Sequence, residues 1–329
     1  MRKYLKNKKK KSDNFFTKLF NGFVTLCLTL AMLWGHQAYS TSTGLKFAQL
    51  SDVHFSDSAP NSTFKMLGDS GKILDDAINQ INEEDNLDFV MITGDLIDTP
   101  FEKELRAVLS HLDNFNNIPW YFAFGNHDRC VGGYLTTSVY MKMLKDSNKN
   151  YKFNTPYYSF TPKKGFKVIV LDNIITDKIT SQGYIGEDQY SWLKKELDKS
   201  SKNTVLIFMH IPVIEPFPSP GHRLKNSSQI MSLIESYKNP IGVFQGHYHA
   251  AKITQRNNVL YVSSPALASY PNAFRIVNVT NYKDKTTFEF RWMETKLANV
   301  QKMSKILVLA PSVYEGDKQD REGIFEIKK

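Results

Sequence analysis

Residues 120–128 read WYFAFGNHD, five apolar or aromatic residues followed at once by Gly125, Asn126, His127 and Asp128. A short apolar run of this length predicts a buried β-strand, and the glycine that follows it predicts the turn where the strand ends. Asn, His and Asp side chains supply the oxygen and nitrogen atoms that bind metal ions. This stretch therefore predicts a strand that carries metal ligands at its carboxyl end.

The same arrangement, an apolar run followed by a polar cluster, occurs at four other places. The other predicted strands are Leu45 to Leu50, Phe89 to Thr93, Val205 to Met209 and Ile241 to Gln245. The clusters that follow them are Asp52-Val53-His54, Gly94-Asp95, His210 and Gly246-His247-Tyr248-His249. In open α/β sheets, ligands bind beyond the carboxyl ends of the strands. We therefore expect the five clusters to converge on one site that holds two metal ions.

Spacing within the clusters indicates how the ligands are shared. Asp52 and His54 are two residues apart, so on an extended backbone their side chains point to the same side and can bind one metal. The same spacing separates His247 and His249, each of which can meet a different metal. Asp95 is suited to bridge two cations, because a carboxylate offers several lone pairs. Tight turns that let the ligands converge are expected at Gly94, Gly125 and Gly246.

The rest of the body alternates helix and strand signals, which is typical of a layered α/β domain. Amphipathic runs predict helices from Ser70, around Leu105 to Leu112 and from Glu187. Further strands are predicted at Tyr157 to Phe160, Phe166 to Leu171, Val259 to Ser263, Phe274 to Val279 and Thr286 to Trp292. Few helices separate these strands, so part of the sheet system is expected to be antiparallel. We predict one catalytic domain over residues 41–296, followed by an extension, 297–329, whose structure the sequence leaves open.

The basic character of the chain belongs mostly to its N-terminus. Residues 1–40 contribute +7 of the formal net charge of +9, so the body carries only +2. A near-neutral body offers no electrostatic surface for a polyanion, and no nucleic-acid partner is expected. An uncharged apolar run, Leu19 to Gly35, and the small-x-small triplet Ala38-Tyr39-Ser40 follow the basic residues, as in an export signal.

Residues 1–40 leave two interpretations open, a cleaved signal peptide and a retained signal anchor, because about 17 apolar residues are at the lower limit for crossing a bilayer. Both interpretations place the body outside the cytoplasm, in a periplasmic, membrane-anchored or secreted position. The membrane would be a partner through this segment if it stays uncleaved. The two cysteines, Cys27 and Cys130, allow no disulfide framework in the body. The sequence does not indicate an oligomeric state.

The order Asp-x-His, Gly-Asp, Gly-Asn-His-Asp, His, Gly-His-x-His resembles the calcineurin-like metallophosphoesterase superfamily, from about Leu45 to about Val279. The resemblance implies an α/β fold, a four-layer αββα sandwich of mixed sheets with two metals near its centre. Carried over by position, one metal would take Asp52, His54, Asp95 and His249. The other would take Asp95, Asn126, His210 and His247. The ions are expected to be divalent or trivalent transition metals, Mn, Fe, Zn, Co or Ni, because His, Asp and Asn suit them all.

Two metals about 3.5 to 4 Å apart predict hydrolysis of a small phosphoester by a hydroxide that bridges the ions. His127 is the candidate proton donor or charge stabiliser, and we expect Asp128 to hold its ring by a hydrogen bond. Arg129 is a candidate phosphate contact because it is adjacent to this pair. His222 and Arg223 are further candidates from the Pro-rich loop 212–226 between two ligand clusters.

The residues after Gly94-Asp95 indicate the branch of the superfamily. Leu96-Ile97-Asp98 lacks the Arg-Gly of protein serine/threonine phosphatases, and Asp98 stands where purple acid phosphatases have a Tyr and double-strand-break nucleases a His. The pattern resembles the bacterial branch of cyclic-nucleotide and glycerophosphodiester phosphodiesterases. We therefore expect an exported or membrane-anchored hydrolase of a phosphodiester or phosphomonoester. Two alternatives stay open, a membrane-tethered hydrolase of lipid head groups and a non-catalytic scaffold, although no ligand is missing as it would be in a scaffold.

Overall fold

The computed structural model describes residue 20, residues 22–26 and residues 42–329. The chain divides into two compact units, Met1–Ser42 and Thr43–Lys329. In the first unit, Phe20 and residues 22–26 are helical. The predicted apolar run 19–35 lies mostly outside the described residues, and the triplet 38–40 lies wholly outside them. Within the part of the chain that is described, no helix has both the length and the hydropathy needed to cross a membrane.

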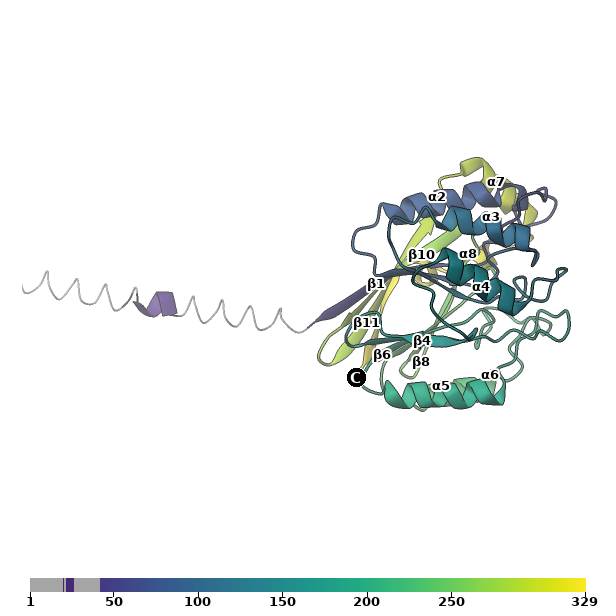
Figure 1. The fold of residues 1–329 in the computed structure, drawn as a ribbon. Coiled ribbons are helices and arrows are strands. Elements are labelled where there is room, and N and C mark those ends of the chain that lie inside the picture. The colour runs from purple at the N-terminus through teal and green to yellow at the C-terminus, as the bar shows by residue number, and fades with distance from the viewer. Residues whose placement is uncertain (1–19, 21, 27–41) are drawn as a thin grey trace, which may run out of the picture. The chain divides into compact units, whose positions relative to one another are not determined.

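Two six-stranded mixed sheets form the second unit (Figure 1). The first sheet contains, in spatial order, β12 (Gly323–Lys328), β11 (Lys285–Glu294), β10 (Ala273–Asn281), β1 (Thr43–Leu50), β2 (Phe89–Thr93) and β3 (Trp120–Ala123). The second contains β4 (Tyr158–Phe160), β5 (Phe166–Val170), β6 (Thr204–Phe208), β7 (Ile241–Gln245), β9 (Val259–Ser263) and β8 (Lys252–Arg256). Strands β1 to β3 are parallel, as are β5, β6, β7 and β9, whereas β10 to β12, β4 and β8 pair antiparallel. The predicted mixture of parallel and antiparallel pairing is confirmed.

Helices cover the outer faces of the two sheets. Helices α2 (Ser70–Asn82) and α3 (Glu102–Leu112) lie on one side, and α5 (Glu187–Lys199) and α6 (Ser227–Glu235) lie on the opposite side (Figure 1). The remaining helices are η1 (Leu67–Asp69), α4 (Thr137–Ser147), α7 (Ala298–Leu307), α8 (Pro311–Glu315) and α9 (Lys318–Arg321). The four-layer αββα sandwich that the resemblance implied is therefore confirmed.

Aromatic rings join the two sheets at the centre of the sandwich. Phe47 on β1 stacks on Phe89 of β2 with 5.1 Å between ring centroids. The same ring packs edge-on against Phe208 and Phe244 of the second sheet, at 5.5 and 5.1 Å. All four side chains are buried. Removing such large apolar surfaces from water is the main force that holds the sheets face to face.

Residues 297–329, whose structure the sequence left open, pack on the sandwich. Strand β12 pairs antiparallel with β11 and forms the edge of the first sheet. In α9, the buried Asp320 accepts hydrogen bonds from the Ile253 N–H at 2.9 Å and from Lys252 Nζ at 3.0 Å. Both partners belong to β8 of the second sheet. The C-terminal segment therefore connects the edges of the two sheets and belongs to the same compact unit.

Candidate metal centre

The polar clusters predicted from the sequence lie together where β1, β2, β3, β6 and β7 end. The Asp52 N–H donates to the Gly94 carbonyl at 3.1 Å, so the first two clusters are in contact. The His247 N–H donates to both carboxylate oxygens of Asp52 at 3.1 Å, and the His127 N–H donates to Asp95 Oδ1 at 2.8 Å. Residues almost two hundred positions apart are thus neighbours at one edge of the sandwich.

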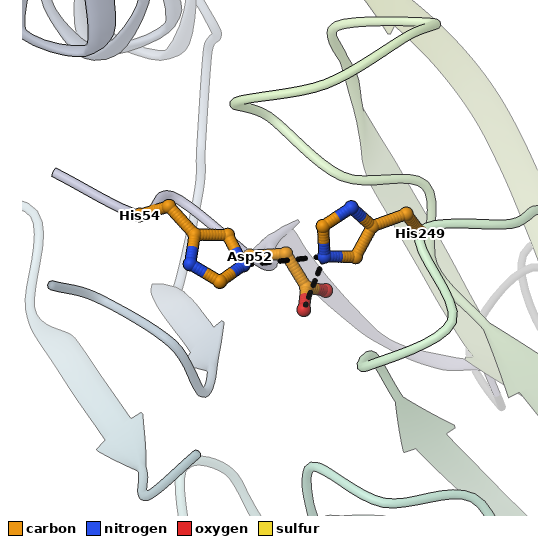
Figure 2. A group of neighbouring side chains, drawn as sticks. All are labelled: Asp52, His54 and His249. Atoms are coloured by element: carbon orange, nitrogen blue, oxygen red, sulfur yellow. Dashed lines mark hydrogen bonds and ion pairs between the residues drawn. The ribbon is translucent and has the colours of Figure 1, made fainter. Parts of the chain in front are cut away.

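Asp52, His54 and His249 form a first group of converging ligands, and Figure 2 shows their side chains pointing toward one another. His249 Nε2 lies 3.3 Å from Asp52 Oδ1 and 3.2 Å from His54 Nε2. All three residues are buried. His54 Nε2 also lies 3.5 Å from Asp95 Oδ2, which connects this group to the next one.

Asp95, His210 and His247 form a second group, and Asn126 lies beside them. His210 Nε2 is 3.3 Å from Asp95 Oδ2, 3.2 Å from Asn126 Oδ1 and 3.1 Å from His247 Nδ1. The same oxygen of Asp95 faces both His54 and His210. The structure therefore brings all seven predicted ligands together, with Asp95 between the two groups.

The outer nitrogens of the histidines show that the site suits metal ions. His54 Nδ1 lies 3.0 Å from the carboxylate of Asp98, which only accepts hydrogen bonds, so the neutral ring carries its proton on Nδ1. Its Nε2 lone pair then faces the carboxylate of Asp95. Two acceptors that face each other in a buried site repel unless a cation lies between them. The donor set and the outer-shell carboxylate both fit a metal ion at this position.

Charges in the site favour the ligand forms that bind metals. Burial raises the pKa of Asp52, but attraction to His249 and His210 outweighs burial and lowers it to about 2. Burial and the neighbouring Lys65 lower the pKa of His54 to about 3, and burial and His210 lower that of His247 to about 3. At neutral pH the carboxylate is therefore ionised and these two rings are neutral, as metal ligation requires.

His210 behaves differently from the other rings. Burial lowers its pKa, but attraction to Asp95 and Asp52 outweighs burial and raises it to about 9. The two buried carboxylates, Asp52 and Asp95, thus stabilise a positive charge beside His210 Nε2, which either a proton or a metal ion can supply. A metal bound here must displace the proton on His210 Nε2, because Nδ1 lies 2.9 Å from the Thr93 carbonyl and donates to it.

Five of the seven predicted ligands have a left-handed backbone, and they include the two pairs, Asp52/His54 and His247/His249, for which the sequence predicted an extended chain. Asp52, His54, Asp95, His247 and His249 have φ of 52°, 43°, 51°, 72° and 56°. The other non-glycine residues with positive φ in the described part of the chain are all asparagines, which tolerate this region. Such a conformation costs on the order of 1–3 kcal/mol per residue and clusters at functional sites. The predicted extended geometry was wrong, although the predicted convergence of the side chains is observed.

Two of the predicted turn glycines are required for space rather than for their backbone angles. A Cβ on Gly125 would collide with the side chain and backbone of Asp95. A Cβ on Gly246 would lie 2.7 Å from Asp52 Oδ2, which is closer than real contacts allow. Of the three predicted turn glycines, Gly94 alone has a positive φ, 89°. The glycines therefore let neighbouring strand ends approach until the ligands meet.

His127 lies beside the first group of ligands. Its ring packs edge-on against the ring of His54 with 4.6 Å between centroids, and its side chain is 21% exposed. His127 Nδ1 lies 2.7 Å from the backbone carbonyl of Asp98 and donates to it. Nε2 is therefore the nitrogen that can give or take a proton.

Asp128 does not hold the His127 ring, so that part of the prediction was wrong. Its carboxylate accepts hydrogen bonds from the Gly125 N–H at 2.8 Å, the Leu96 N–H at 2.9 Å and the Tyr140 hydroxyl at 3.0 Å. Burial, followed by repulsion from Asp95, raises the pKa of Asp128 to about 7. Asp128 thus fixes the loops that carry Asp95 and Asn126, while the Asp98 carbonyl orients His127.

Of the three predicted substrate contacts, His222 is the one whose side chain lies beside a predicted metal ligand. Its ring centroid is 5.4 Å from that of His247, and its Nδ1 is 2.8 Å from Ser219 Oγ. The guanidinium of Arg129 is paired with Asp172 and lies over the Phe124 ring. Arg223 lies 3.8 Å from Glu215 and lines a different cavity. Both arginines are therefore already engaged by carboxylates.

Sequence reasoning missed residues that surround the ligands. Lys65 forms an ion pair with Asp98 and lies 3.5 Å from His54 Nδ1, so the outer shell of His54 is a charged pair. Asp98 entered the sequence argument only as a marker of the branch, and the two residues between Asp95 and Asp98, Leu96 and Ile97, give no signal of this contact. A cavity of about 200 Å³ beside His247 and His249 was also not predicted.

Comparison with known proteins agrees with this geometry. The sequence profile of the calcineurin-like phosphoesterases matches residues 45–251, which contain all seven predicted ligands. A 3',5'-cyclic-nucleotide phosphodiesterase from Nostoc sp. is 29% identical over 184 residues, which are 55% of this chain and 62% of that protein. A manganese-dependent ADP-ribose/CDP-alcohol diphosphatase from Arabidopsis thaliana is 25% identical over 252 residues, covering 62% of this chain and 79% of that protein.

A solved structure is similar in fold. The crystal structure of a dimetal phosphatase from Danio rerio matches with a TM-score of 0.59 at 18% identity, covering 77% of this chain and 99% of that one. Its likeness supports the sandwich architecture, while the profile match supports the family. The converging ligands and the profile match over more than half of the chain lead to one conclusion: the protein belongs to the calcineurin-like phosphoesterases.

Proposed function

We propose that the protein is a metal-dependent hydrolase of small phosphodiesters. The observation that carries the proposal is the position of Asp95 Oδ2, 3.5 Å from His54 Nε2 and 3.3 Å from His210 Nε2. One buried carboxylate oxygen between two groups of imidazoles is the arrangement expected of a ligand shared by two cations. The named phosphodiesterase and diphosphatase relatives support the reaction class.

Two bound cations would polarise the phosphoryl oxygen and lower the pKa of a water molecule, which supplies the nucleophile. The carboxylate, amide and imidazole side chains of the centre would hold the two ions, and the positive charge of the ions would neutralise the phosphate. His127 would give a proton to the leaving oxygen through Nε2 when its ring carries a proton on both nitrogens, because Nδ1 is committed to the Asp98 carbonyl. Asp98 and Lys65 hold the ring of His54 in the orientation that ligation needs.

Manganese is the metal that we propose to test first. Imidazole nitrogens with carboxylate and amide oxygens accept several transition metals, so the donor set alone does not select one. The Arabidopsis relative is named as manganese-dependent. We expect Mn²⁺ to restore activity to protein stripped with a chelator.

The proposal is tested on the purified full-length chain. After chelation and dialysis, bis(4-nitrophenyl) phosphate and 4-nitrophenyl phosphate are assayed with and without Mn²⁺, and bound metal is counted by elemental analysis. We expect two ions per chain and faster hydrolysis of the diester. A chain that binds two ions without hydrolysing either ester would be a scaffold. A chain that binds no metal would refute the proposal.

We further propose that the body acts outside the cytoplasm, exported or anchored by residues 1–40. The support is the sequence alone, a run of basic residues before an apolar segment and a small-x-small triplet. Protease added to intact spheroplasts should digest the body if it is exported and anchored, and a cleaved protein should be found in the soluble external fraction. Full protection from the protease together with absence from that fraction would contradict export.

A further inference from the structure

The cavity of about 200 Å³ beside the metal centre has aromatic walls. The metal ligands His247 and His249 form one side of it. The remaining lining residues are Phe64, Phe217, Ser219, His222, Tyr248 and Tyr314, and we call this cavity the aromatic pocket. A group bound in the pocket is therefore next to a phosphate held at the two histidines.

The rings of the pocket are arranged around its open space. Phe64 lies 5.8 Å from the ring of His249 and is 45% exposed, so part of its surface is open to a ligand. Phe217 packs edge-on against Tyr248 at 5.2 Å and against Tyr314 at 6.2 Å. The rings of Phe64 and Phe217 therefore lie on the wall of the pocket, where they can contact a bound group.

Hydrogen bonds fix two of the walls. The Tyr248 hydroxyl donates to Glu215 Oε1 at 2.6 Å, so its ring cannot rotate freely. The Ala251 N–H donates to the Tyr314 carbonyl at 2.9 Å, which holds α8 against the loop that carries His247 and His249. Tyr314 comes from residues 297–329 and lies beyond the range that the family profile matches. The C-terminal segment thus supplies a wall of the pocket.

The size and chemistry of the pocket select a flat heteroaromatic ring. Pockets that hold a whole drug-sized ligand measure roughly 300–1,000 Å³, so this one fits a ring system and not an entire molecule. Aromatic side chains stack on nucleobases of any sequence. Ser219 and His222, whose Oγ and Nδ1 pair at 2.8 Å, also line the pocket, and the polar edge of a base could hydrogen-bond to such groups whereas an alkyl chain could not.

We propose that the aromatic pocket binds the base of a nucleoside phosphodiester whose phosphate lies at the metal centre. This inference rests on the proposed function and names its substrate class. Phe64, Phe217 and Tyr314 select the substrate by stacking on the base, and the metal ligands act on the phosphorus whatever the leaving group.

The test measures binding of a matched pair of probes, adenosine 5'-monophosphate and ribose 5-phosphate, to the Mn²⁺-loaded full-length chain by calorimetry. The two probes share the phosphate and the ribose, so the difference in affinity reports the base alone. We expect the nucleotide to bind about 5- to 100-fold more tightly, the range of one stacked base. Equal affinities, or no binding of the nucleotide at millimolar concentration, would overturn the proposal.

Variants locate the effect in the pocket. Phe64→Ala, Phe217→Ala and Tyr314→Ala should each reduce nucleotide affinity several-fold and leave ribose 5-phosphate unchanged. Tyr314→Phe should keep the affinity, because the ring and not the hydroxyl stacks. Tyr282→Ala removes another partly exposed ring, between β10 and β11, and should have no effect. If a variant lost as much affinity for ribose 5-phosphate as for the nucleotide, the base would not stack on the substituted ring.

Hydrolysis separates this proposal from the proposed function. Cyclic AMP should be hydrolysed with a higher kcat/KM than glycerophosphoethanolamine, a diester without an aromatic group. Phe64→Ala should bring the ratio of these two kcat/KM values closer to one. If both diesters are hydrolysed equally by the wild type and the variant, the pocket assignment fails while the phosphodiesterase stands. If neither is hydrolysed but the nucleotide binds in a base-dependent way, the proposed function fails while the pocket assignment stands.

Discussion

The metal centre and the aromatic pocket share His247 and His249, but they are built from different parts of the chain. The predicted metal ligands follow the central strands and are mostly buried, and five of the seven have a left-handed backbone. The pocket walls come from the loop before η1, the loop between β6 and α6, and α8, and several of them are partly exposed.

This difference separates two properties of the protein. The predicted metal ligands lie at strand ends, where a small displacement would separate them from the ions that we propose they hold. The rings that we propose to choose the substrate lie mostly on loops, which tolerate change without loss of the fold. We therefore expect substitutions in the metal centre to abolish turnover of every ester, and substitutions in the pocket to change the preference among esters.

The largest effect is expected from Asp95→Asn, which removes charge from the ligand between the two groups. Turnover should fall at least about a thousandfold for all substrates, more than the 10–100-fold typical of an outer-shell change. Asp98→Asn is the matched control, because Asp98 contacts His54 but is not a predicted ligand. Elemental analysis and kcat would check both variants. If Asp95→Asn and Asp98→Asn lost the same amount of kcat and bound metal, the distinction between a bridging and an orienting carboxylate would fail.

His127→Asn should lower kcat about a hundredfold, within the range of general acid–base catalysis, while the bound metal stays unchanged. The ring lies beside the ligands, but its Nδ1 is committed to the Asp98 carbonyl, which leaves Nε2 for the substrate. The loss should be smaller for 4-nitrophenyl esters than for alkyl esters, because nitrophenolate leaves without a proton. A variant that loses metal in proportion to its activity would instead make His127 part of the metal centre.

Gly125→Ala should disturb the metal centre without changing any ligand. Its Cβ would collide with Asp95, so we expect a loss of about 1–3 kcal/mol in the free energy of unfolding and weaker metal binding. Gly44→Ala is the control, because a Cβ there meets nothing within 4 Å. Thermal unfolding and metal titration would measure both. If Gly125→Ala behaved like Gly44→Ala, close approach of the strand ends would not be what assembles the site.

Much of the metal centre could be predicted from the sequence because its signals are local. Each ligand cluster directly follows an apolar run, and the five predicted strands agree with β1, β2, β3, β6 and β7 to within two residues. Strand β8 was missed because its sequence, KITQR, is mostly polar, as an edge strand allows. Strand β12, GIFEIK, was missed because it is short and lies at the end of the chain after a run of charged residues.

The rest of the site has no local signature. The hydrogen bond that orients His127 is accepted by a backbone carbonyl, which every residue possesses. Asp128 follows His127 directly, and adjacency suggested a contact that the turn does not form. The pocket joins Phe64, Phe217 and Tyr314, which are separated by up to 250 positions and come from segments with no shared pattern. Only the three-dimensional arrangement shows that these rings face the same space.

The smallest effect is expected far from both regions, at Glu196 on α5. Burial raises the pKa of Glu196, but hydrogen bonds from Ser159, Lys199 and Lys167 outweigh burial and lower it from 4.5 to about 2. A lowered folded-state pKa stabilises the fold above the unfolded value, and this contribution is lost as pH falls from about 4.5 to about 2. Glu196→Gln should therefore cost about 1–2 kcal/mol at pH 7, less at pH 3, and leave kcat unchanged. Urea unfolding of the metal-free protein would measure the free energy of unfolding at both pH values. The exposed Asp146→Asn is the control. If the loss of stability in Glu196→Gln were the same at pH 7 and pH 3, its origin would not be ionic.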